Sequence, residues 1–553
     1  MSNITPIQKR GVGMALKNPK KQHRGTFNPY PSGVFTRYES KVIGNIFLLK
    51  PLLALLGLED IVDSVCPLAS NRASISVGEV CKILVLNRLN SPKPLYKVED
   101  WADHVSTIDL FGIPSYLLND DKLGRCLELL AAYSGDIEAL LCLKLIHDFG
   151  VSPELVIWDS TSFYFEGAYD DSEFVTFGYA VEGRTDAKRV RIGMCMDAGT
   201  GIPLTSSRES GKKPDSELVV DNLETLKATL SKAGRAEYVV VADRALASVK
   251  NVFLLNSKGV KFVAPADDDD CYTRLILGTS DDEFREADYK SKDGEPFFIA
   301  ERGICLHRKL DGEERQYESG WFRAIVIKSP SQLKVDEMRL SKETETVDAW
   351  LRDVRDNKIN RRRYKKLEYV EKRIDAFFTG PLRRYRNIYN PKVVSDGNRL
   401  DFSWSMDEEA LQRLIALNGK YVVVSNQMDP VVSAADIFRT SRRRSHIETR
   451  MRYLKSQLKV RPVFLESEMR IRGLAFVTNL ALVVYCLLEH MLKQAGVDES
   501  VRELFLDFDQ IALTKAKLPN GAEVSHVENA LPFHYRTLDK LGLLIGEYHR
   551  PQG

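Results

Sequence analysis

The chain has 553 residues, of which 44% are hydrophobic and 28% are charged, and its formal net charge is +2. This balance is typical of a globular protein of several domains and excludes a largely disordered chain. A net charge this small does not by itself indicate nucleic-acid binding. The distribution of charge along the chain therefore carries more information than the sum.

Eight cysteines are scattered without a C-x-x-C pair, and nine histidines show no paired metal-binding spacing. This pattern excludes a zinc knuckle and a disulfide framework, and it is typical of reduced thiols in a cytosolic protein. The N-terminus lacks an apolar run, so no secretory signal is expected. The most apolar stretch, 474–488, is shorter than the roughly 20 residues of a membrane span. We interpret it as a buried core helix, with no membrane partner.

The chain begins with basic residues and has no acid before Glu39. We predict that residues 1–38 form a disordered basic tail, which either contacts DNA phosphates or is solvated without a role. From there to residue 150, apolar residues recur at spacings of three and four, as in Val80, Ile83 and Leu84. This period predicts a helical domain over residues 39–150.

From residue 151 the texture changes to short apolar strands, which we predict at 155–158, 163–165, 190–194, 238–242 and 261–264. Helices are predicted between the later strands, at about 216–233 and 247–257. The order β-β-β-α-β-α-β indicates an α/β fold, with a mixed sheet flanked by helices over residues 151–265.

Residues 266–420 differ from both neighbours, with four consecutive Asp, a short strand at 297–300 and a charged helix at about 347–373. A compact domain rarely contains so long a loop, so we predict an inserted, partly β-rich domain. A strand at 421–425 closes the insertion. Helices at 436–459 and 467–495 then complete the core, and residues 496–553 are expected to form a tail.

Asp159 and Asp243 each directly follow a predicted strand. A carboxylate at the carboxyl end of a strand is a common place for chemistry in α/β folds. If the two strands are neighbours, the carboxylates share one site and repel each other unless a cation lies between them. Mg²⁺ or Mn²⁺ is the natural cation for carboxylate oxygens. The alternative is a turn or a helix cap after each strand, which is the usual role of an isolated Asp.

A single acid, Glu448, lies within a run of basic residues. The nine cations of this run are Arg439, Arg442, Arg443, Arg444, Arg450, Arg452, Lys455, Lys459 and Arg461. On a helix, Glu448 adjoins an apolar stripe and shares its face with cations at three- and four-residue spacing. Such a face fits a phosphate-binding surface around a metal-binding carboxylate. The alternative is a solvated helix with Glu448 paired to a neighbouring Arg, but nine cations to one acid is far from a balanced face.

Motifs for other chemistries are incomplete. The segment 210–213 (SGKK) lacks the upstream glycine and the Ser or Thr of a phosphate-binding loop, so no nucleotide cofactor is expected. Thr161 stands where a phosphoaspartate enzyme of the dehalogenase type has its second Asp. A G-x-S-x-G nucleophile elbow does not occur in the sequence.

Several segments, taken together and in this order, resemble insertion-sequence transposases of the DDE class with an RNase H-like domain. The first-Asp motif is matched by 157–167 (IWDSTSFYFEG), and following segments by 178–186 (GYAVEGRTD) and 201–204 (GIPL). The second-Asp motif is matched by 239–245 (VVVADRA), with Ala245 where glycine is usual. The glutamate helix is matched by 447–455 (IETRMRYLK), and the resemblance spans about residues 40–495.

The family's signature around the glutamate is Tyr, Arg, Glu and Lys at fixed spacing. Arg444, Glu448 and Lys455 match it, but Ser441 stands at the Tyr position. Ser445 replaces the aromatic residue after the Arg. In relatives these side chains help to hold the DNA end, so the departures concern end handling rather than the metal site.

The resemblance implies cleavage at transposon ends and transfer of the 3′-hydroxyl into target DNA. Asp159, Asp243 and Glu448 are expected to hold two Mg²⁺ or Mn²⁺ ions. It also implies an end-binding N-terminal domain, an insertion before the glutamate helix, homodimers on paired terminal inverted repeats, and a bacterial or archaeal cytoplasm with the nucleoid. Residues expected to position DNA phosphates are Arg244, Arg442, Arg444, Arg450, Arg452, Lys455 and Lys459. The alternatives are a metal-dependent nuclease without strand transfer and a non-catalytic DNA-binding relic.

Overall fold

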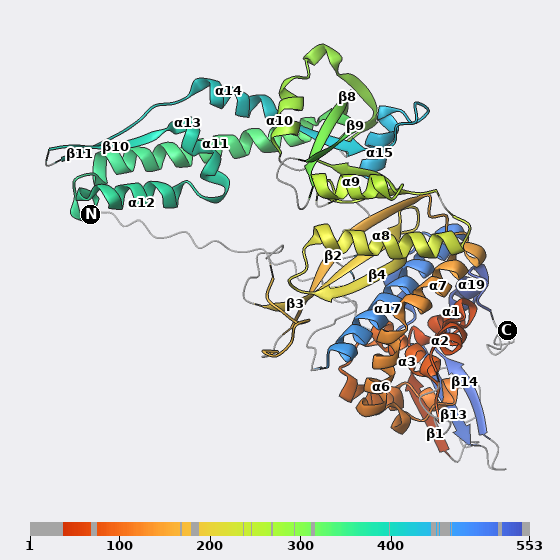
Figure 1. The fold of residues 1–553 in the computed structure, drawn as a ribbon. Coiled ribbons are helices and arrows are strands. Elements are labelled where there is room, and N and C mark those ends of the chain that lie inside the picture. The colour runs from red at the N-terminus through yellow and green to blue at the C-terminus, as the bar shows by residue number, and fades with distance from the viewer. Residues whose placement is uncertain are drawn as a thin grey trace, which may run out of the picture.

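The computed structural model shows a helical N-terminal part, a nine-stranded sheet, and a second group of helices that extends away from both (Figure 1). It describes residues 37–67, 74–165, 169–178, 187–235, 237–244, 246–266, 269–291, 293–310, 316–397, 399–443, 450, 453, 465, 467–517 and 523–544.

In the described parts of the predicted helical region, 39–67 and 74–150, the structure has seven α-helices. They are α1 (Ile46–Leu56), α2 (Leu58–Val65), α3 (Val77–Asn90), α4 (Val98–His104), α5 (Thr107–Phe111), α6 (Asp120–Ala132) and α7 (Ser134–Asp148). Local sequence fixes their ends: Ser76 and Glu79 form a reciprocal capping box at the start of α3, with bonds of 3.0 and 2.7 Å. The apolar periodicity of the sequence therefore predicted this region correctly as helical.

Helix α17 (Glu468–Gln494) lies at the centre of the main core and packs against α3, α6 and β4. A side chain at Gly473 would place its Cβ 2.1 Å from the carbonyl oxygen of Leu127, so only glycine allows the approach to α6. Among the described residues, α17 alone is long and apolar enough to span a membrane, and 94% of its most apolar window is buried within this fold. This agrees with the predicted core helix.

The sheet has the strand order β4-β3-β2-β5-β6-β12-β9-β8-β7. Its strands are β2 (Leu155–Phe165), β3 (Lys188–Asp197), β4 (Pro203–Ser210), β5 (Val239–Val241), β6 (Lys261–Pro265), β7 (Arg285–Lys290), β8 (Pro296–Lys309), β9 (Tyr317–Lys328) and β12 (Lys420–Ser425). The pairs β2–β5 and β5–β6 are parallel and the others antiparallel. Helices α8 (Asp215–Lys232) and α9 (Val249–Ser257) follow β4 and β5. The predicted α/β class with a mixed sheet is confirmed, and the first five strands have the order of an RNase H-like core.

Two details of the predicted strand order are wrong. The segments 155–158 and 163–165 belong to one strand, β2, which pairs without interruption with β3. Strand β4 was not predicted, because its residues are largely polar and show no apolar pattern. Its pairing with β3 stabilises it as a strand. The element order is nevertheless as predicted, because one error removes a strand and the other adds one.

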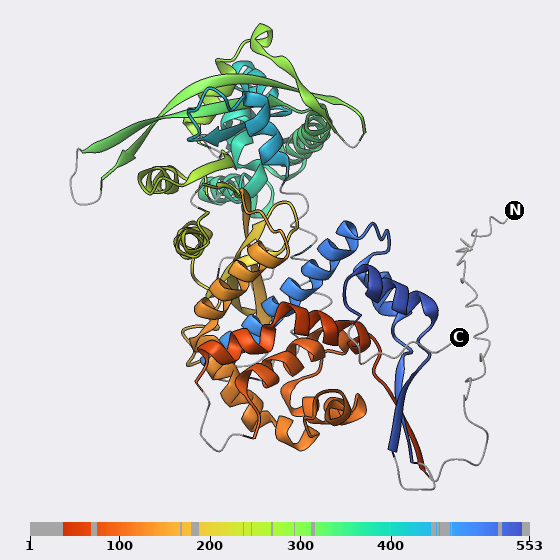
Figure 2. The ribbon, with the colours of Figure 1, turned by 90° about the vertical axis from the view of Figure 1, so that its right-hand side faces the viewer.

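The stretch 266–420, predicted as a single insertion, divides into two structural parts. Strands β7, β8 and β9 extend the core sheet through β12, and Figure 2 shows β8 and β9 as a long curved ribbon. Helix α10 (Asp270–Leu277) precedes them. The second part has a separate hydrophobic core, which we call the outer cluster. Its elements are α11 (Pro330–Asp353), α12 (Leu367–Phe377), α13 (Tyr385–Tyr389), α14 (Glu408–Leu417), β10 (Pro391–Asp396) and β11 (Arg399–Trp404).

The charged helix predicted at 347–373 is interrupted. Helix α11 ends at Asp353, and α12 begins only at Leu367. Asn360 and Arg362, between the two helices, have positive φ angles of 61° and 47°, a conformation that an α-helix cannot contain. Apolar periodicity continues on both sides of the break, which is why the sequence did not reveal it.

The residues after 495 form more than the expected tail. They contain α18 (Val501–Asp507), β13 (Ala512–Lys517), β14 (Glu523–Glu528) and α19 (Pro532–Lys540). Strand β13 pairs with β14 and also with β1 (Arg37–Val42), so the two ends of the described chain meet in a three-stranded sheet. Phe47 of α1 packs against Phe508 and Tyr535, with ring centroids 6.3 and 5.9 Å apart. These contacts anchor the C-terminal segment to the N-terminal helices.

Candidate active site

The parallel pair β2–β5 brings Asp159 and Asp243 to the same level of the sheet. The last paired residues are Ile157 of β2 and Val241 of β5, and each aspartate lies two residues beyond one of them. Neighbouring strands lie about 4.8 Å apart. Both aspartates are partly exposed, and their backbones lie beyond the paired ends of neighbouring strands.

Asp159 was expected directly after the end of a strand. The structure corrects this, because Asp159 lies within β2. The strand continues to Phe165 with β3 as its partner, whereas β5 ends at Val241. Among the described strands, none pairs with β2 beyond Ile157 on the β5 side. The early end of β5, rather than the end of β2, therefore ends the strand pairing on this side of Asp159.

The contacts of the next residue fix the face on which Asp159 lies. Ser160 Oγ donates a hydrogen bond of 2.6 Å to Asp215 of α8 and accepts one of 2.7 Å from Arg191. Since side chains alternate along a strand, Asp159 faces away from α8. On that side it is in register with Met194, which in turn pairs with Ser206 of β4.

A buried polar network holds the helices against this face. Glu138 of α7 accepts hydrogen bonds from the Ser206 amide at 3.0 Å and from Arg208 Nη2 at 2.7 Å. Asn479 of α17 donates to both Glu138 and Ser206, at 3.2 and 3.1 Å. Glu138 and Arg208 are only 4% and 7% exposed, so this ion pair is enclosed by the protein. Sequence analysis missed these residues because nothing in the local sequence distinguishes them from surface charges.

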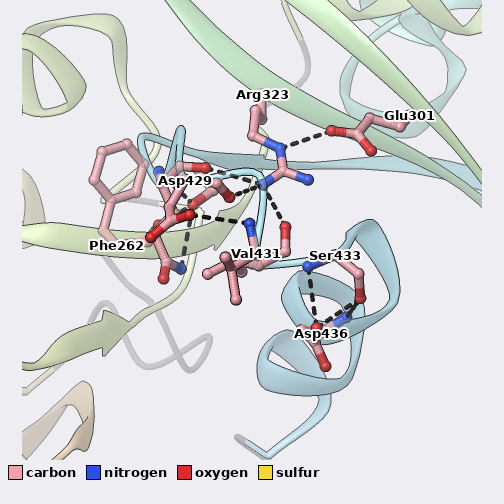
Figure 3. A network of polar contacts seen from close by, with 10 residues as sticks. Phe262, Glu301, Arg323, Asp429, Val431, Ser433 and Asp436 are labelled. Atoms are coloured by element: carbon pink, nitrogen blue, oxygen red, sulfur yellow. Dashed lines mark hydrogen bonds and ion pairs between the residues drawn. The ribbon is translucent and has the colours of Figure 1, made fainter.

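The loop from β12 to α15 (Ala434–Arg442) leads toward the segment that contains Glu448, and β9 fixes it (Figure 3). Arg323 of β9 pairs with Glu301 at 2.7 Å and donates hydrogen bonds to the carbonyl oxygens of Gln427 and Val432, at 3.1 and 2.7 Å. Ser433 and Asp436 then form a capping box that starts α15. These contacts fix the start of α15 against the sheet, and the first cations of the basic run, Arg439 and Arg442, lie in the last turn of this helix.

Several predicted site residues lie outside the described residues. They are Glu448, Arg444, Arg452, Lys455 and Lys459, together with Ser445. The first of the two long predicted helices, 436–459, is described as α15 up to Arg442 and at two later helical positions, Arg450 and Tyr453. Ser441, at the family's Tyr position, donates a hydrogen bond of 2.7 Å to the carbonyl oxygen of Phe438.

Those two later positions are fixed to α17. The Tyr453 ring stacks on Tyr485 with centroids 3.9 Å apart. Burial raises the pKa of both phenols, that of Tyr485 to about 12, so both remain neutral. Arg450 forms an ion pair with Glu489, and its side chain is only 14% exposed. The structure therefore gives Arg450 a partner inside the protein rather than a surface available to DNA.

The described cations predicted to contact DNA differ from Arg450. Arg244, next to Asp243, is exposed. Arg442, at the end of α15, is also exposed, and its guanidinium lies over the ring of Phe297 at 5.2 Å from the centroid. Stacking on the ring restricts the position of the guanidinium.

The donor chemistry of the two aspartates fits a divalent metal ion. Two adjacent carboxylates supply the oxygen ligands that Mg²⁺ and Mn²⁺ prefer, and a cation would relieve their repulsion. Within the part of the chain that the structure describes, no group of three Asp, Glu, His or Cys side chains could hold a metal ion. A complete site would thus need an acid from outside the described residues, and Glu448 is one of these.

Comparison with known families identifies the class of protein. A family described as "Transposase DDE domain" matches residues 151–484, and a domain of unknown function, DUF4277, matches residues 38–142. No curated protein matches the chain. Because the transposase match covers more than half of the sequence, the chain belongs to the family of transposases with a DDE domain, which generally use divalent metal ions.

Among solved structures, the chain is similar to a piggyBac transposase in a synaptic complex with hairpin DNA, determined by cryo-EM. The two share 10% sequence identity, with 84% of this chain and 79% of that chain covered, and the TM-score is 0.37. At this level the similarity adds no argument about the site.

Proposed function

We propose that this transposase cleaves DNA at the ends of its element and joins the freed 3′ ends to target DNA, in a reaction that depends on Mg²⁺ or Mn²⁺. The observation that carries the proposal is that Asp159 and Asp243 each lie two residues beyond the last paired residue of two neighbouring parallel strands. Carboxylates that meet at this level repel each other, and a shared cation relieves the repulsion, so the arrangement favours a metal site over two separate turn residues.

Asp159, Asp243 and Glu448 are the proposed metal ligands. Two divalent ions held by such carboxylates supply charge stabilisation for the attacking and the leaving oxygen of an in-line displacement at phosphorus. In cleavage, a water oxygen forms a bond to phosphorus, the bond to the 3′ oxygen breaks, and a 3′-hydroxyl is released. In joining, that hydroxyl loses its proton and bonds to a target phosphorus, and a target 3′ oxygen leaves. No protein side chain is covalently modified in either step.

Exposed cations near the acids are the proposed phosphate contacts. Arg244 and Arg442 are exposed, and we assign the same role to Arg444, Arg452, Lys455 and Lys459, which surround Glu448 in the sequence. Guanidinium groups donate paired, charge-assisted hydrogen bonds to phosphate oxygens and so hold the strand in line. We leave Arg450 out of this set, because it is paired with Glu489.

The rest of the proposal concerns assembly. We assign binding of the terminal inverted repeats to the helical region 39–150 and expect a homodimer on two paired ends, in the bacterial or archaeal cytoplasm. The alternatives are a metal-dependent nuclease that cuts without joining, and a DNA-binding relic without activity. The placement of both aspartates two residues beyond the paired ends of neighbouring strands supports an active site.

The test is a cleavage and joining assay on DNA that carries the element's ends, with a supercoiled target plasmid and Mg²⁺. Wild-type protein is expected to nick at the ends and to give joined products, and Asp243→Ala is expected to give neither. The control is Asp221→Asn, which removes an exposed carboxylate of α8 that pairs with Lys213. This variant is expected to retain both activities. Cleavage without joined products would favour the nuclease, and activity of Asp243→Ala would exclude the assigned site.

A further inference from the structure

A loop of the outer cluster carries five cations that form no ion pair with the residues that the structure describes. The residues between α11 and α12 include Arg361, Arg362, Arg363, Lys365 and Lys366, which we call the cationic loop. All five are exposed, and none forms an ion pair with a described residue. Cations elsewhere in the cluster behave differently: Lys358 pairs with Asp353, Arg384 with Glu343 and Arg386 with Asp375.

The loop is held in place by contacts with the outer cluster. The Asn360 side chain accepts a hydrogen bond from the Leu400 amide and donates one to its carbonyl oxygen, both of 2.8 Å. The side chains of Ile359 and Tyr364 pack against the core of the outer cluster. Arg362 is held at a φ of 47°, a conformation that bulky residues rarely adopt. The five charges therefore stand on a fixed backbone rather than on a free chain.

This concentration of charge is not balanced by the adjoining segments. Residues 354–373 contain nine cations and three acids, and the loop itself contains no acid. A balanced, solvated face would pair most of these cations with neighbours at helical spacing. Five like charges on a fixed loop, none of them in an ion pair with a described residue, instead form an array that a polyanion can bind at several points. Duplex DNA carries one negative charge per about 1.7 Å of its axis, which matches a closely spaced array of this kind.

We infer that the cationic loop is a second DNA-backbone contact, separate from the aspartates, which binds the phosphates of duplex DNA. The inference rests on the proposed DNA substrate but not on the chemistry of cleavage. Helix α11 leads from the sheet to the loop: Asp336, near its start, accepts a hydrogen bond of 2.9 Å from Gly419 at the edge of β12, and the helix has 24 residues. At about 1.5 Å per residue the helix is about 36 Å long. The loop therefore lies at the end of α11 that is remote from the sheet (Figure 1), and we expect it to contact a different stretch of the duplex from that bound at the aspartates.

The test measures the affinity of the full-length protein for a mixed-sequence duplex of about 40 base pairs, roughly four helical turns. Fluorescence anisotropy is recorded without metal ions, so that no cleavage occurs, at salt concentrations from about 50 to 200 mM. The variant replaces Arg361, Arg363 and Lys366 by Gln. Each phosphate contact contributes about 0.9 to the slope of log K against log salt, so we expect the slope to fall by about 3 in magnitude.

The control replaces three exposed cations of the same region, Lys334, Lys342 and Arg413, by Gln. It removes the same net charge, and two of these cations are paired with acids, Lys334 with Glu295 and Arg413 with Glu409. Its slope is expected to change by less than about 1. An equal loss in both variants would show that only total charge matters, and it would overturn the inference.

An unchanged slope in the loop variant would also overturn the inference and would point to an acidic protein as the partner. Thermal unfolding of each variant checks folding, and Arg363→Gln alone, with an expected slope change of about 1, serves if the triple variant is unstable. The outcome is separable from the proposed function. If the loop variant shows the slope change but the wild-type protein never cuts DNA, this inference stands and the proposed transposase chemistry fails. If the protein cuts and joins DNA but the loop variant shows no slope change, only the role of the loop is excluded.

Discussion

The aspartates at the sheet and the cationic loop of the outer cluster are both groups of charges of one sign. The two regions differ in how their other charged side chains are paired. Near the sheet, two buried cations pair with acids: Arg191 with the partly exposed Asp215, and Arg208 with the buried Glu138. Asp159 and Asp243 each lie two residues beyond the paired ends of neighbouring strands. On the outer cluster the like charges are positive, exposed and unpaired within the described residues.

The difference separates charges that hold the fold from charges available to a ligand. An enclosed ion pair such as Glu138–Arg208 satisfies itself, so its loss affects stability. The proposed site and the cationic loop differ from such an enclosed pair. We expect the aspartates to bind cations and the cationic loop to bind a polyanion. The predictions below test this division.

The largest effect is expected for Asp159→Asn. The substitution keeps the shape of the side chain and removes one metal-binding charge, so the cleavage rate is expected to fall at least about a thousandfold, or roughly 4 kcal/mol of transition-state stabilisation. Stability is expected to change little, because the site is partly exposed. A single-turnover cleavage assay measures the rate. A loss below tenfold would place Asp159 among the structural charges.

Glu138→Ala is expected to have the largest effect on stability. It leaves Arg208 enclosed without its carboxylate and removes the acceptor for Ser206, which costs about 3–5 kcal/mol of the free energy of unfolding. Urea unfolding measures the change. Glu209→Gln, which removes one of two carboxylates near Lys213 at a partly exposed site, is the control, with an expected cost below about 1 kcal/mol. Equal costs for the two variants would contradict the division.

The two hydrophobic cores are expected to respond separately to cavities. Leu351→Ala removes a fully buried side chain from the outer cluster, at a cost of about 2–4 kcal/mol. Because the outer cluster has its own core, we expect this variant to unfold in two transitions, with only the first shifted. Calorimetry distinguishes this from a single shifted transition, which would show that the two cores unfold together.

The smallest effect concerns pH and the C-terminal segment. Burial lowers the pKa of His534, whose Nδ1 accepts a hydrogen bond from the Leu531 amide at 2.8 Å. The folded state therefore prefers the neutral ring, and the unfolded chain binds the proton more readily. Stability from this group is complete above about pH 6.5 and is lost progressively as the pH falls below that value toward the lower pKa of the folded state. Melting temperatures between pH 5 and 8 are expected to show this loss, and His534→Gln to reduce it, whereas the exposed His104 provides a control substitution.

The sequence predicted elements with their own periodicity and missed those that depend on distant partners. The segments that became α8, α9, β5, β6 and α17 lie within a few residues of their predicted positions. Strand β1, by contrast, pairs with β13, so that Ser40 lies opposite Thr514. Such strands carry polar residues and are stable only when paired, so no local pattern reveals them.

The same distinction applies to the site. Both aspartates were recognised from the motifs around them, but their common level depends on the register of β2 and β5, which no sequence pattern fixes. The partners of Arg450 and Arg208 lie on distant helices, so basic residues that are structural and basic residues that face outward look alike in the sequence. The break between α11 and α12 was missed for a related reason, because the Asn360–Leu400 contact that fixes it is not local.

The central claim, that Asp159 and Asp243 share a metal ion, is tested most directly by crystals of the protein grown with Mn²⁺ and DNA. Anomalous scattering locates the metal without reference to activity. We predict a peak at about 2.0–2.4 Å from a carboxylate oxygen of each aspartate. A peak that contacts neither residue, or only one of them while the other points to the opposite face of the sheet, would contradict the account.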